Sequence, residues 1–193
     1  MPTFLKLGGV LERGEVRDVL ISGNNKSLSE LSVDDIIATS SLRRRAQLLH
    51  YNPQFTIVDI RGNVDSRVKK LQDGYCSSII LAGAGVTRLN MKHVITEYLD
   101  VKYMIPAVAQ GIIGIEIREN DADTQAIIDG INHAPSLIAA HAERAFLNTL
   151  EGGCQIPIGC YSTLTEETYH IIGFVSSIDG KQLIQCEASG NKV

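Results

Sequence analysis

The sequence lacks the patterns that mark a membrane protein, a disulfide-bonded secreted protein or a zinc protein. No apolar run among its 193 residues approaches the roughly 20 that a membrane-spanning helix needs. The first residues, MPTFLKLGGV, do not combine a charged segment with a long apolar one, so we expect no secretory signal. The four cysteines, at positions 76, 154, 160 and 186, include no CxxC pair and no zinc-like spacing with histidine. We therefore expect a cytoplasmic protein with no disulfide framework, no metal and no membrane contact.

The charge is acidic as a whole and basic in places. A net charge of −4 makes nucleic acid an unexpected partner. Eight arginines nevertheless lie in the first half of the chain: Arg13, Arg17, Arg43, Arg44, Arg45, Arg61, Arg67 and Arg88. A locally basic cleft in an acidic protein suggests a small polyanion as ligand. The alternative for each arginine is a solvated surface position.

Strands and helices are expected to alternate in the first part of the chain. Short apolar runs predict strands over 36–39, 55–60 and 77–82, and helical patterns follow the first two over 42–51 and 64–72. This alternation is typical of an α/β domain with a largely parallel sheet, whose ligands lie beyond the carboxyl ends of the strands. Arginines follow each of the three predicted strands: Arg43 and Arg44, then Arg61, then Arg88.

The pattern changes in the second half. Residues 101–117 are apolar but interrupted by Pro106 and Gly111, which suggests a strand, a crossing segment and another strand. Helices are predicted over 121–132 and 135–150, the second opened by proline and ended by glycines. After Cys154, apolar and polar residues alternate, with SIDGKQ as a hairpin turn. An antiparallel second domain is therefore expected from about residue 133.

The segment ATSSLRRR predicts an anion site. A helix start offers free N–H groups and a partial positive charge, and the hydroxyls of Thr39, Ser40 and Ser41 add donors. Arg43 and Arg44 add forked, permanently charged donors that suit a carboxylate or phosphate. The alternative is a capped surface helix with a solvated arginine face.

Cys154 stands in LEGGCQIPIG, on a loop between a helix and a sheet. A thiol in such a place could be exposed and reactive. Spacing alone favours the alternative, an inert buried cysteine, and we keep that interpretation for Cys76, Cys160 and Cys186.

Five motifs in order resemble the porphobilinogen deaminases (hydroxymethylbilane synthases). They are ATSSLRRRAQL, IRGNVDSRVKKL, IILAGAGVTRL, PAVAQGIIGIE and AERAFLNTLEGGCQIPIG, and together they cover nearly the whole chain. The resemblance implies two α/β domains of periplasmic-binding-protein type and a smaller α+β domain with antiparallel strands. By this resemblance, residues 1–16 are a remnant or hinge of domain 1, and residues 17–105 form domain 2. Residues 106–132 form the hinge and the segment that returns to domain 1. Residues 133–193 form a truncated domain 3 that bears the cofactor.

The resemblance also implies roles for individual residues. Cys154 would hold a dipyrromethane cofactor through a thioether. Gln110 would lie in the hinge between the first two domains. The positions that would bind acetate and propionate groups of cofactor and substrate are Ser41, Arg43, Arg44, Arg61, Arg67 and Arg88.

The sequence also departs from the family pattern. Ala38 and Ala109 replace glycines, and alanine forbids some backbone angles, so the hinge is expected to be stiffer. The family's catalytic aspartate belongs to an HS-x-KD motif before a PT-like pair, which Pro2 and Thr3 resemble. We therefore expect that aspartate to precede Met1, with none of the catalytic acids in this chain and the last helical part of domain 3 also missing.

The implied activity is the condensation of four porphobilinogen units into hydroxymethylbilane, with loss of ammonia, on a covalent dipyrromethane primer. The implied ligands are porphobilinogen and the growing pyrrole chain, the implied state is a monomer, and this chain alone is expected to be inactive. One alternative is a noncatalytic α/β carboxylate-binding module, which would have no need of EGGC. A second is a noncatalytic truncated paralogue or fragment.

Overall fold

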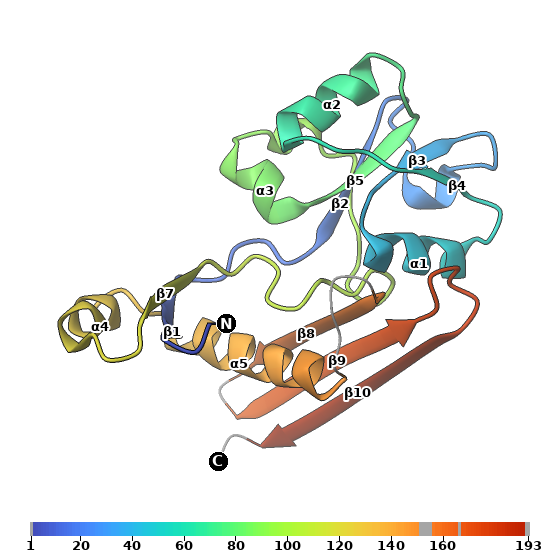
Figure 1. Cartoon of the computed structure of the whole chain (residues 1–193). Coiled ribbons are helices and arrows are strands. Elements are labelled where there is room, and N and C mark those ends of the chain that lie inside the picture. The colour runs from blue at the N-terminus through green and yellow to red at the C-terminus, as the bar shows by residue number, and fades with distance from the viewer. Residues whose placement is uncertain (1, 151–155, 166, 192–193) are drawn as a thin grey trace.

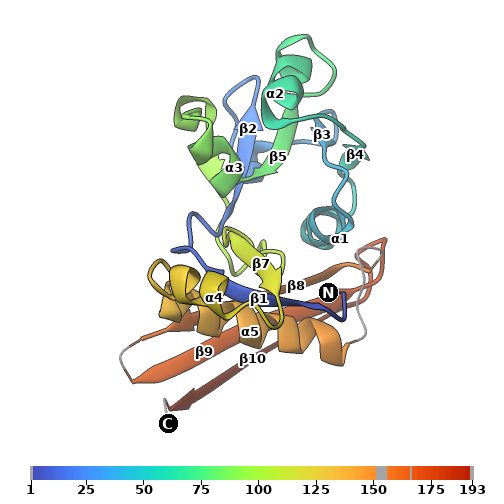
Figure 2. The same cartoon turned by 60° about the vertical axis from the view of Figure 1, so that its left-hand side comes forward.

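The protein has an α/β part packed above an antiparallel part (Figure 1, Figure 2). The computed structural model describes residues 2–150, 156–165 and 167–191. A five-stranded sheet with helices α1 to α3 forms the upper part, and a three-stranded sheet with helix α5 forms the lower part. A two-stranded sheet and helix α4 lie beside α5. The expected fold class, an α/β domain followed by a small antiparallel α+β domain, is confirmed, whereas the domain boundaries stay a prediction.

The five-stranded sheet has the order β4-β3-β5-β2-β6. Its strands are β2 (Asp18–Ser22), β3 (Ile36–Ala38), β4 (Thr56–Val58), β5 (Ser78–Ala82) and β6 (Glu97–Tyr98). β3 is parallel to β4 and β5, as the strand–helix alternation predicts, whereas β2 is antiparallel to both β5 and β6. The carboxyl ends of β3, β4 and β5 therefore share one edge.

Helices cover both faces of this sheet. They are α1 (Leu42–Tyr51), α2 (Val64–Gln72) and α3 (Gly83–Arg88), with short 3-10 turns at Leu28–Glu30 and Lys92–Val94. In β5, Ile79 packs with Val68 of α2 and Val86 of α3, while Ile80 packs with Leu48 of α1. This alternation follows from the two-residue period of a strand, and burying each such side chain contributes about 1.5–3 kcal/mol.

The lower part consists of α5 (Ala134–Thr149) against an antiparallel sheet of order β10-β9-β8. The strands are β8 (Ile158–Leu164), β9 (Thr168–Ser176) and β10 (Leu183–Asn191). Cys160 is buried in β8, as Cys76 is buried before β5. Cys186 is exposed on the edge strand β10, so the expectation that it is buried is wrong.

Two chain segments connect the parts. Residues 11–17, the first crossing segment, lead from β1 (Leu5–Val10) into β2. Residues 99–113, the second crossing segment or simply the crossing segment, lead back from β6 to β7 (Gly114–Arg118). The segments lie side by side, because Leu11 N–H donates to Ile113 O and Gly14 N–H to Gly111 O. The strand expected early in 101–117 does not form. Turns lie at 101–103 and 108–111 instead, and in the second of them Ala109 (φ 58°) and Gly111 (φ 86°) have a left-handed backbone.

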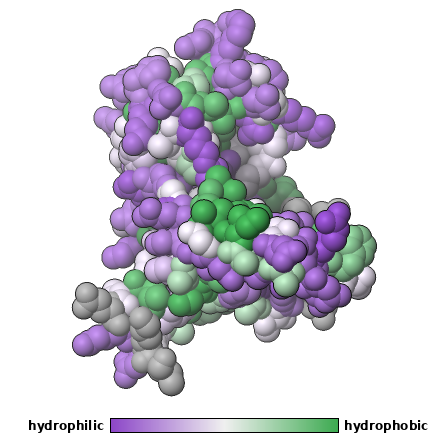
Figure 3. Space-filling model, turned by 90° about the vertical axis from the view of Figure 1, so that its left-hand side faces the viewer, coloured by the Kyte–Doolittle hydropathy of each residue, from purple (hydrophilic) through white to green (hydrophobic). Residues whose placement is uncertain are grey.

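Helix α4 (Ala122–Asp129) packs on β1 at the outer side of the lower part. It carries exposed isoleucines, with Ile127 71% and the following Ile131 54% exposed. Figure 3 shows the resulting apolar surface on the side where α4 lies. In the described part of the chain, no helix combines the length and apolar character needed to span a membrane.

The β9–β10 hairpin fastens the lower sheet to α1. Gly180, at the turn of this hairpin, has φ 70°. A side chain does not fit there, because an added Cβ would lie 2.8 Å from His50 N and against Ala46 O. The Gly180 carbonyl also lies 3.1 Å from His50 Nδ1.

We expect Gly180→Ala to lower the free energy of unfolding by about 1–3 kcal/mol, because the hairpin must withdraw from α1. Urea denaturation would measure this, and Gly190→Ala, where nothing lies within 4 Å of an added Cβ, is the control; equal losses would contradict the explanation.

Candidate carboxylate-binding site

A cavity of about 910 Å³ opens between α2 and α3, at the carboxyl end of β5. It is lined by three arginines, an aspartate and an asparagine together with apolar residues. The lining residues are Arg44, Gly62, Asn63, Val64, Asp65, Arg67, Leu81, Ala82, Gly85, Arg88, Leu89 and Met91. Ligands of α/β proteins bind at this edge of the sheet, so the cavity is the candidate site.

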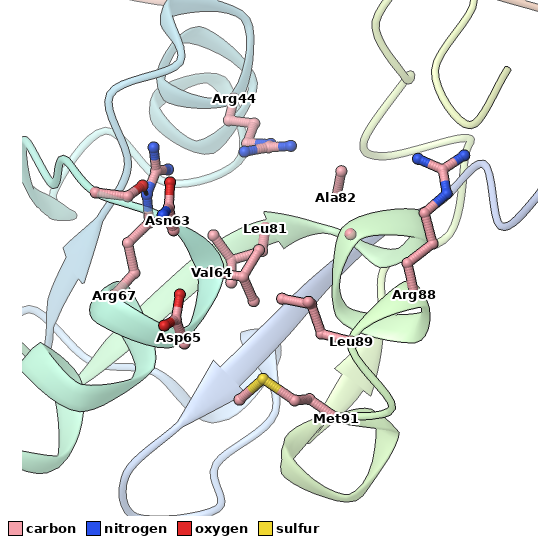
Figure 4. A pocket seen from close by; sticks show the side chains of 12 residues that line it. Arg44, Asn63, Val64, Asp65, Arg67, Leu81, Ala82, Arg88, Leu89 and Met91 are labelled. Carbon is pink, nitrogen blue, oxygen red and sulfur yellow. Dashed lines mark hydrogen bonds between the residues drawn. The ribbon is translucent and has the colours of Figure 1, made fainter. Parts of the chain in front are cut away.

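The arginines approach the cavity from different helices (Figure 4). Arg44 and Arg67 lie on one side and Arg88 on the opposite side, with Val64, Leu81, Leu89 and Met91 between them. Burial, and then the positive charge of Arg44, lower the pKa of Arg67 from its ordinary value. The cavity therefore presents excess positive charge at its ends and an apolar wall between them, which suits a flat ligand with several carboxylates.

Arg67 and Arg88 are each placed by a backbone carbonyl. Arg67 Nε donates to Gly62 O at 2.7 Å, within the turn that leads into α2. Arg88 Nη2 donates to Gly111 O at 3.3 Å, so α3 contacts the segment that returns to β7. Both guanidinium groups keep N–H groups for a ligand, because each of these bonds uses one of five.

Arg43 and Arg44 are buried in a cluster around Asp18. Arg43 Nη2 lies 2.7 Å and Arg44 Nη2 2.8 Å from the Asp18 carboxylate, which is fully buried at the start of β2. Burial alone would raise the pKa of Asp18, but the two arginines outweigh it and lower that pKa. Of the two, only Arg44 also lines the cavity.

The hydroxyl side chains of the predicted anion site serve the backbone instead. Ser40 Oγ donates to Ile60 O at 2.7 Å and accepts from Ile60 N–H at 3.0 Å. Ser41 caps α1 by accepting from Arg44 N–H, and the hydroxyl of the buried Thr39 accepts from Ser41 N–H at 3.3 Å. None of the three is among the residues that line the cavity. Their binding of ligand carboxylates stays a prediction.

The structure describes two of the three remaining predicted residues, and neither lines the cavity. Arg61 is exposed between β4 and α2 and is not part of the cavity lining. Gln110 lies in the crossing segment, where it donates to Asp18 and to Val16 O. Cys154 lies outside the described residues. Its attachment of a cofactor therefore stays a prediction.

Sequence reasoning missed two buried acids, Asp18 and Glu143. Glu143 of α5 is fully buried and forms an ion pair with Arg13 at 2.6 Å. It also accepts from the N–H of Ala109 at 2.7 Å and of Ser162 at 2.8 Å. The signal available was an isolated acid in an otherwise apolar run, as in the segment DVLIS of β2.

The fold and the cavity define an α/β protein with an arginine-lined cavity, and comparison with known proteins names the family. Residues 1–126 match "Porphobilinogen deaminase, dipyromethane cofactor binding domain", and residues 137–193 match "Porphobilinogen deaminase, C-terminal domain". The chain belongs to the porphobilinogen deaminase family.

Curated relatives support the same family. Porphobilinogen deaminase of Brevibacillus brevis is 43% identical over 191 residues, covering 98% of this chain and 62% of that protein. The protein of the same name from Chlorobium phaeobacteroides is 46% identical over 186 residues, covering 96% of this chain and 59% of that protein. The chain thus spans about 60% of the length of these relatives.

Proposed function

We propose that this chain contributes the carboxylate-binding cavity of a porphobilinogen deaminase. The whole protein would condense four porphobilinogen units head to tail into hydroxymethylbilane. In each condensation a carbon–carbon bond forms between the aminomethyl carbon of one unit and the free α carbon of the growing chain. The carbon–nitrogen bond to the amine breaks, ammonia leaves, and the α carbon loses its proton. After four condensations, water would cleave the bond between the primer and the first unit: the hydroxyl goes to the methylene carbon of the product and the proton to the α carbon of the primer.

The observation that carries the proposal is the arginine-lined cavity in a chain of this family. Each pyrrole unit carries two carboxylates, and Arg67 and Arg88 lie on opposite sides of the cavity with apolar side chains between them. Charge-assisted, forked hydrogen bonds hold carboxylates in fixed orientations. We therefore assign substrate and cofactor binding to these arginines together with Arg44.

The residues of the cavity also fit the dipyrromethane cofactor that the family carries. Its two pyrroles bear carboxylates, and when bound through the Cys154 sulfur it would supply the free α carbon on which the chain grows. What the described residues do is bind and orient: arginines fix the carboxylates, and Val64, Leu89 and Met91 exclude water from one face of the ring. Exclusion of water strengthens the arginine–carboxylate attraction.

The test is porphobilinogen binding by arginine variants. We expect Arg67→Leu and Arg88→Leu each to raise the Kd for porphobilinogen about tenfold, because each removes a charge-assisted hydrogen bond worth about 1.5–3 kcal/mol. The melting temperature should stay near that of the wild type, since each side chain makes a single hydrogen bond to a backbone carbonyl.

Isothermal titration calorimetry measures the affinity, and Arg144→Leu on the exposed face of α5 is the matched control. Unchanged affinity in both cavity variants, with a lowered melting temperature, would show that these arginines are structural and would overturn the proposal.

A further inference from the structure

Asp18 connects the cavity to the crossing segment. Its side chain is fully buried, and its oxygens meet Arg43 and Arg44 of α1. Gln110 Nε2 of the crossing segment donates to the same carboxylate at 3.0 Å. A buried carboxylate needs such partners, because burial without them strongly disfavours its charged form. One side chain thus joins β2, α1 and the crossing segment.

The two arginines of the cluster, Arg43 and Arg44, differ in their hydrogen-bond partners and in their position relative to the cavity. Arg43 Nη1 donates to Ile105 O at 2.6 Å, and its Nη2 contacts both Asp18 and Gln110 Oε1. Arg44 Nη1 donates to Ile80 O at 3.2 Å and its Nη2 to Asp18 at 2.8 Å, which uses two of five N–H groups. Among the described residues no acceptor meets the buried Arg44 Nε. Arg44 lines the cavity and Arg43 does not, so the unused N–H groups of Arg44 are the ones placed at the cavity.

The cluster also has one positive charge in excess. Two guanidinium groups share one carboxylate in a place that water hardly reaches, since the arginine side chains are 6% and 10% exposed. Asp65, the acid that lines the cavity, forms no ion pair with Arg44 among the described residues. A buried excess charge favours the arrival of an anion.

We propose that Asp18 is a positioning residue of the carboxylate site: it holds Arg44 at the cavity wall, so that the remaining N–H groups of Arg44 meet a ligand carboxylate. Arg43 acts as the second anchor, fixing Asp18 to the crossing segment through Ile105 and Gln110. The inference rests on the proposed function of the cavity and adds to it a residue that does not line the cavity.

Asp18 could instead serve only as a counter-charge that lets two arginines be buried. The two roles separate in a double variant, Asp18→Asn with Arg43→Gln. This variant keeps one positive charge in the cluster, as in the wild type, and removes the carboxylate that holds Arg44. A pure counter-charge role predicts wild-type binding, and a positioning role predicts weakened binding.

The experiment compares four proteins by calorimetric titration with porphobilinogen: wild type, Asp18→Asn, the double variant, and Glu15→Gln, which alters an ion pair with Arg17 outside the cavity. We expect the Kd to rise about tenfold or more in the double variant, because loss of a charge-assisted hydrogen bond has that effect. Glu15→Gln should bind as the wild type does. Wild-type affinity in the double variant would overturn the proposal, and so would its failure to fold, because Asp18 would then be needed for the fold at constant charge.

A second readout needs no ligand. In ¹⁵N-edited NMR spectra a guanidinium group held by two acceptors gives a distinct, slowly exchanging Nε–H signal, which Arg44→Lys would identify by its loss. We expect this signal to broaden or to exchange faster in the double variant and to persist in Glu15→Gln. An unchanged signal would overturn the proposal. If the wild type bound no porphobilinogen, the proposed function would fail, while this comparison would still decide whether Asp18 holds Arg44.

Discussion

Replacing Glu143 by alanine is expected to lower the free energy of unfolding by about 3–5 kcal/mol, the cost of removing one partner of a buried ion pair. Glu143 has no exposed side-chain surface, and its partner Arg13 is only 11% exposed. The total stability of a domain is about 5–15 kcal/mol. The variant should therefore be unfolded to a large extent under mild denaturing conditions.

The expected loss of stability is large because Glu143 connects its own helix, α5, to three other segments of the chain. Its oxygens accept from Arg13 of the first crossing segment, from Ala109 of the second, and from the N–H and Oγ of Ser162 in β8. Ala109 has φ 58°, a conformation that costs an alanine roughly 1–2 kcal/mol. The Glu143 bond to the Ala109 N–H contributes to holding that backbone in place.

Urea denaturation followed by circular dichroism measures the effect. The matched control is Glu15→Ala, which removes an ion pair with the 43% exposed Arg17. An exposed pair contributes about 0–1 kcal/mol. A Glu143→Ala loss no larger than that of the control would mean that water or rearrangement satisfies Arg13, and would contradict the assigned role. Glu143→Gln should lose less, because the amide keeps an acceptor for Ser162.

Local sequence patterns predict most strands and helices of the α/β part, but they predict little of the structure that connects this part to the lower, antiparallel part. The strands near Ile37, Ile57 and Ile80 and the helices after the first two of them are predicted, because each combines an apolar run with a cap or a turn within a few residues. The short helix α3 after the third strand is not predicted, because its sequence GAGVTR begins with small residues that are typical of a turn. β1 and β2 were not predicted. β1 includes Gly8 and Gly9, and β2 follows directly on the charged residues of the first crossing segment, so neither shows a clear two-residue alternation.

The candidate site also contains some residues that local sequence predicts and others that it does not. Arg44, Arg67 and Arg88 follow predicted strands, so their approach to one edge of the sheet is a consequence of topology. The roles of Asp18 and Glu143 depend on partners up to 130 residues away in sequence, and no local pattern carries that information. The same limit applies to Arg43, whose guanidinium group contacts Ile105 and Gln110, which lie 62 and 67 positions away in sequence.

A second large effect is expected at Cys154. We expect incubation of the chain with porphobilinogen or preformed hydroxymethylbilane to add two pyrrole units to the protein, and Cys154→Ala to abolish this gain completely. A thioether bond would form between the Cys154 sulfur and the methylene carbon of the first unit, with the amine of porphobilinogen or the hydroxyl of hydroxymethylbilane as the leaving group. From porphobilinogen, the second unit would then be added with loss of a second ammonia. From hydroxymethylbilane, four units would attach, and water would then cleave the bond between the second and third units, so that the last two leave as a hydroxymethyl dipyrrole. Intact-mass spectrometry measures the gain, and peptide mapping locates it.

The other cysteines make this a specific test, because the thiolate is the nucleophilic form. Burial, and then the charge of Glu143, raise the pKa of Cys160 to about 12, and burial raises the pKa of Cys76. A raised pKa keeps a thiol protonated at neutral pH, so both should remain unmodified. Cys186 is exposed on β10 and is the one competitor among the described cysteines. Cys186→Ala should therefore keep the full gain in mass, whereas an adduct that maps to Cys186, or a wild-type chain that gains no mass, would contradict the assignment of Cys154.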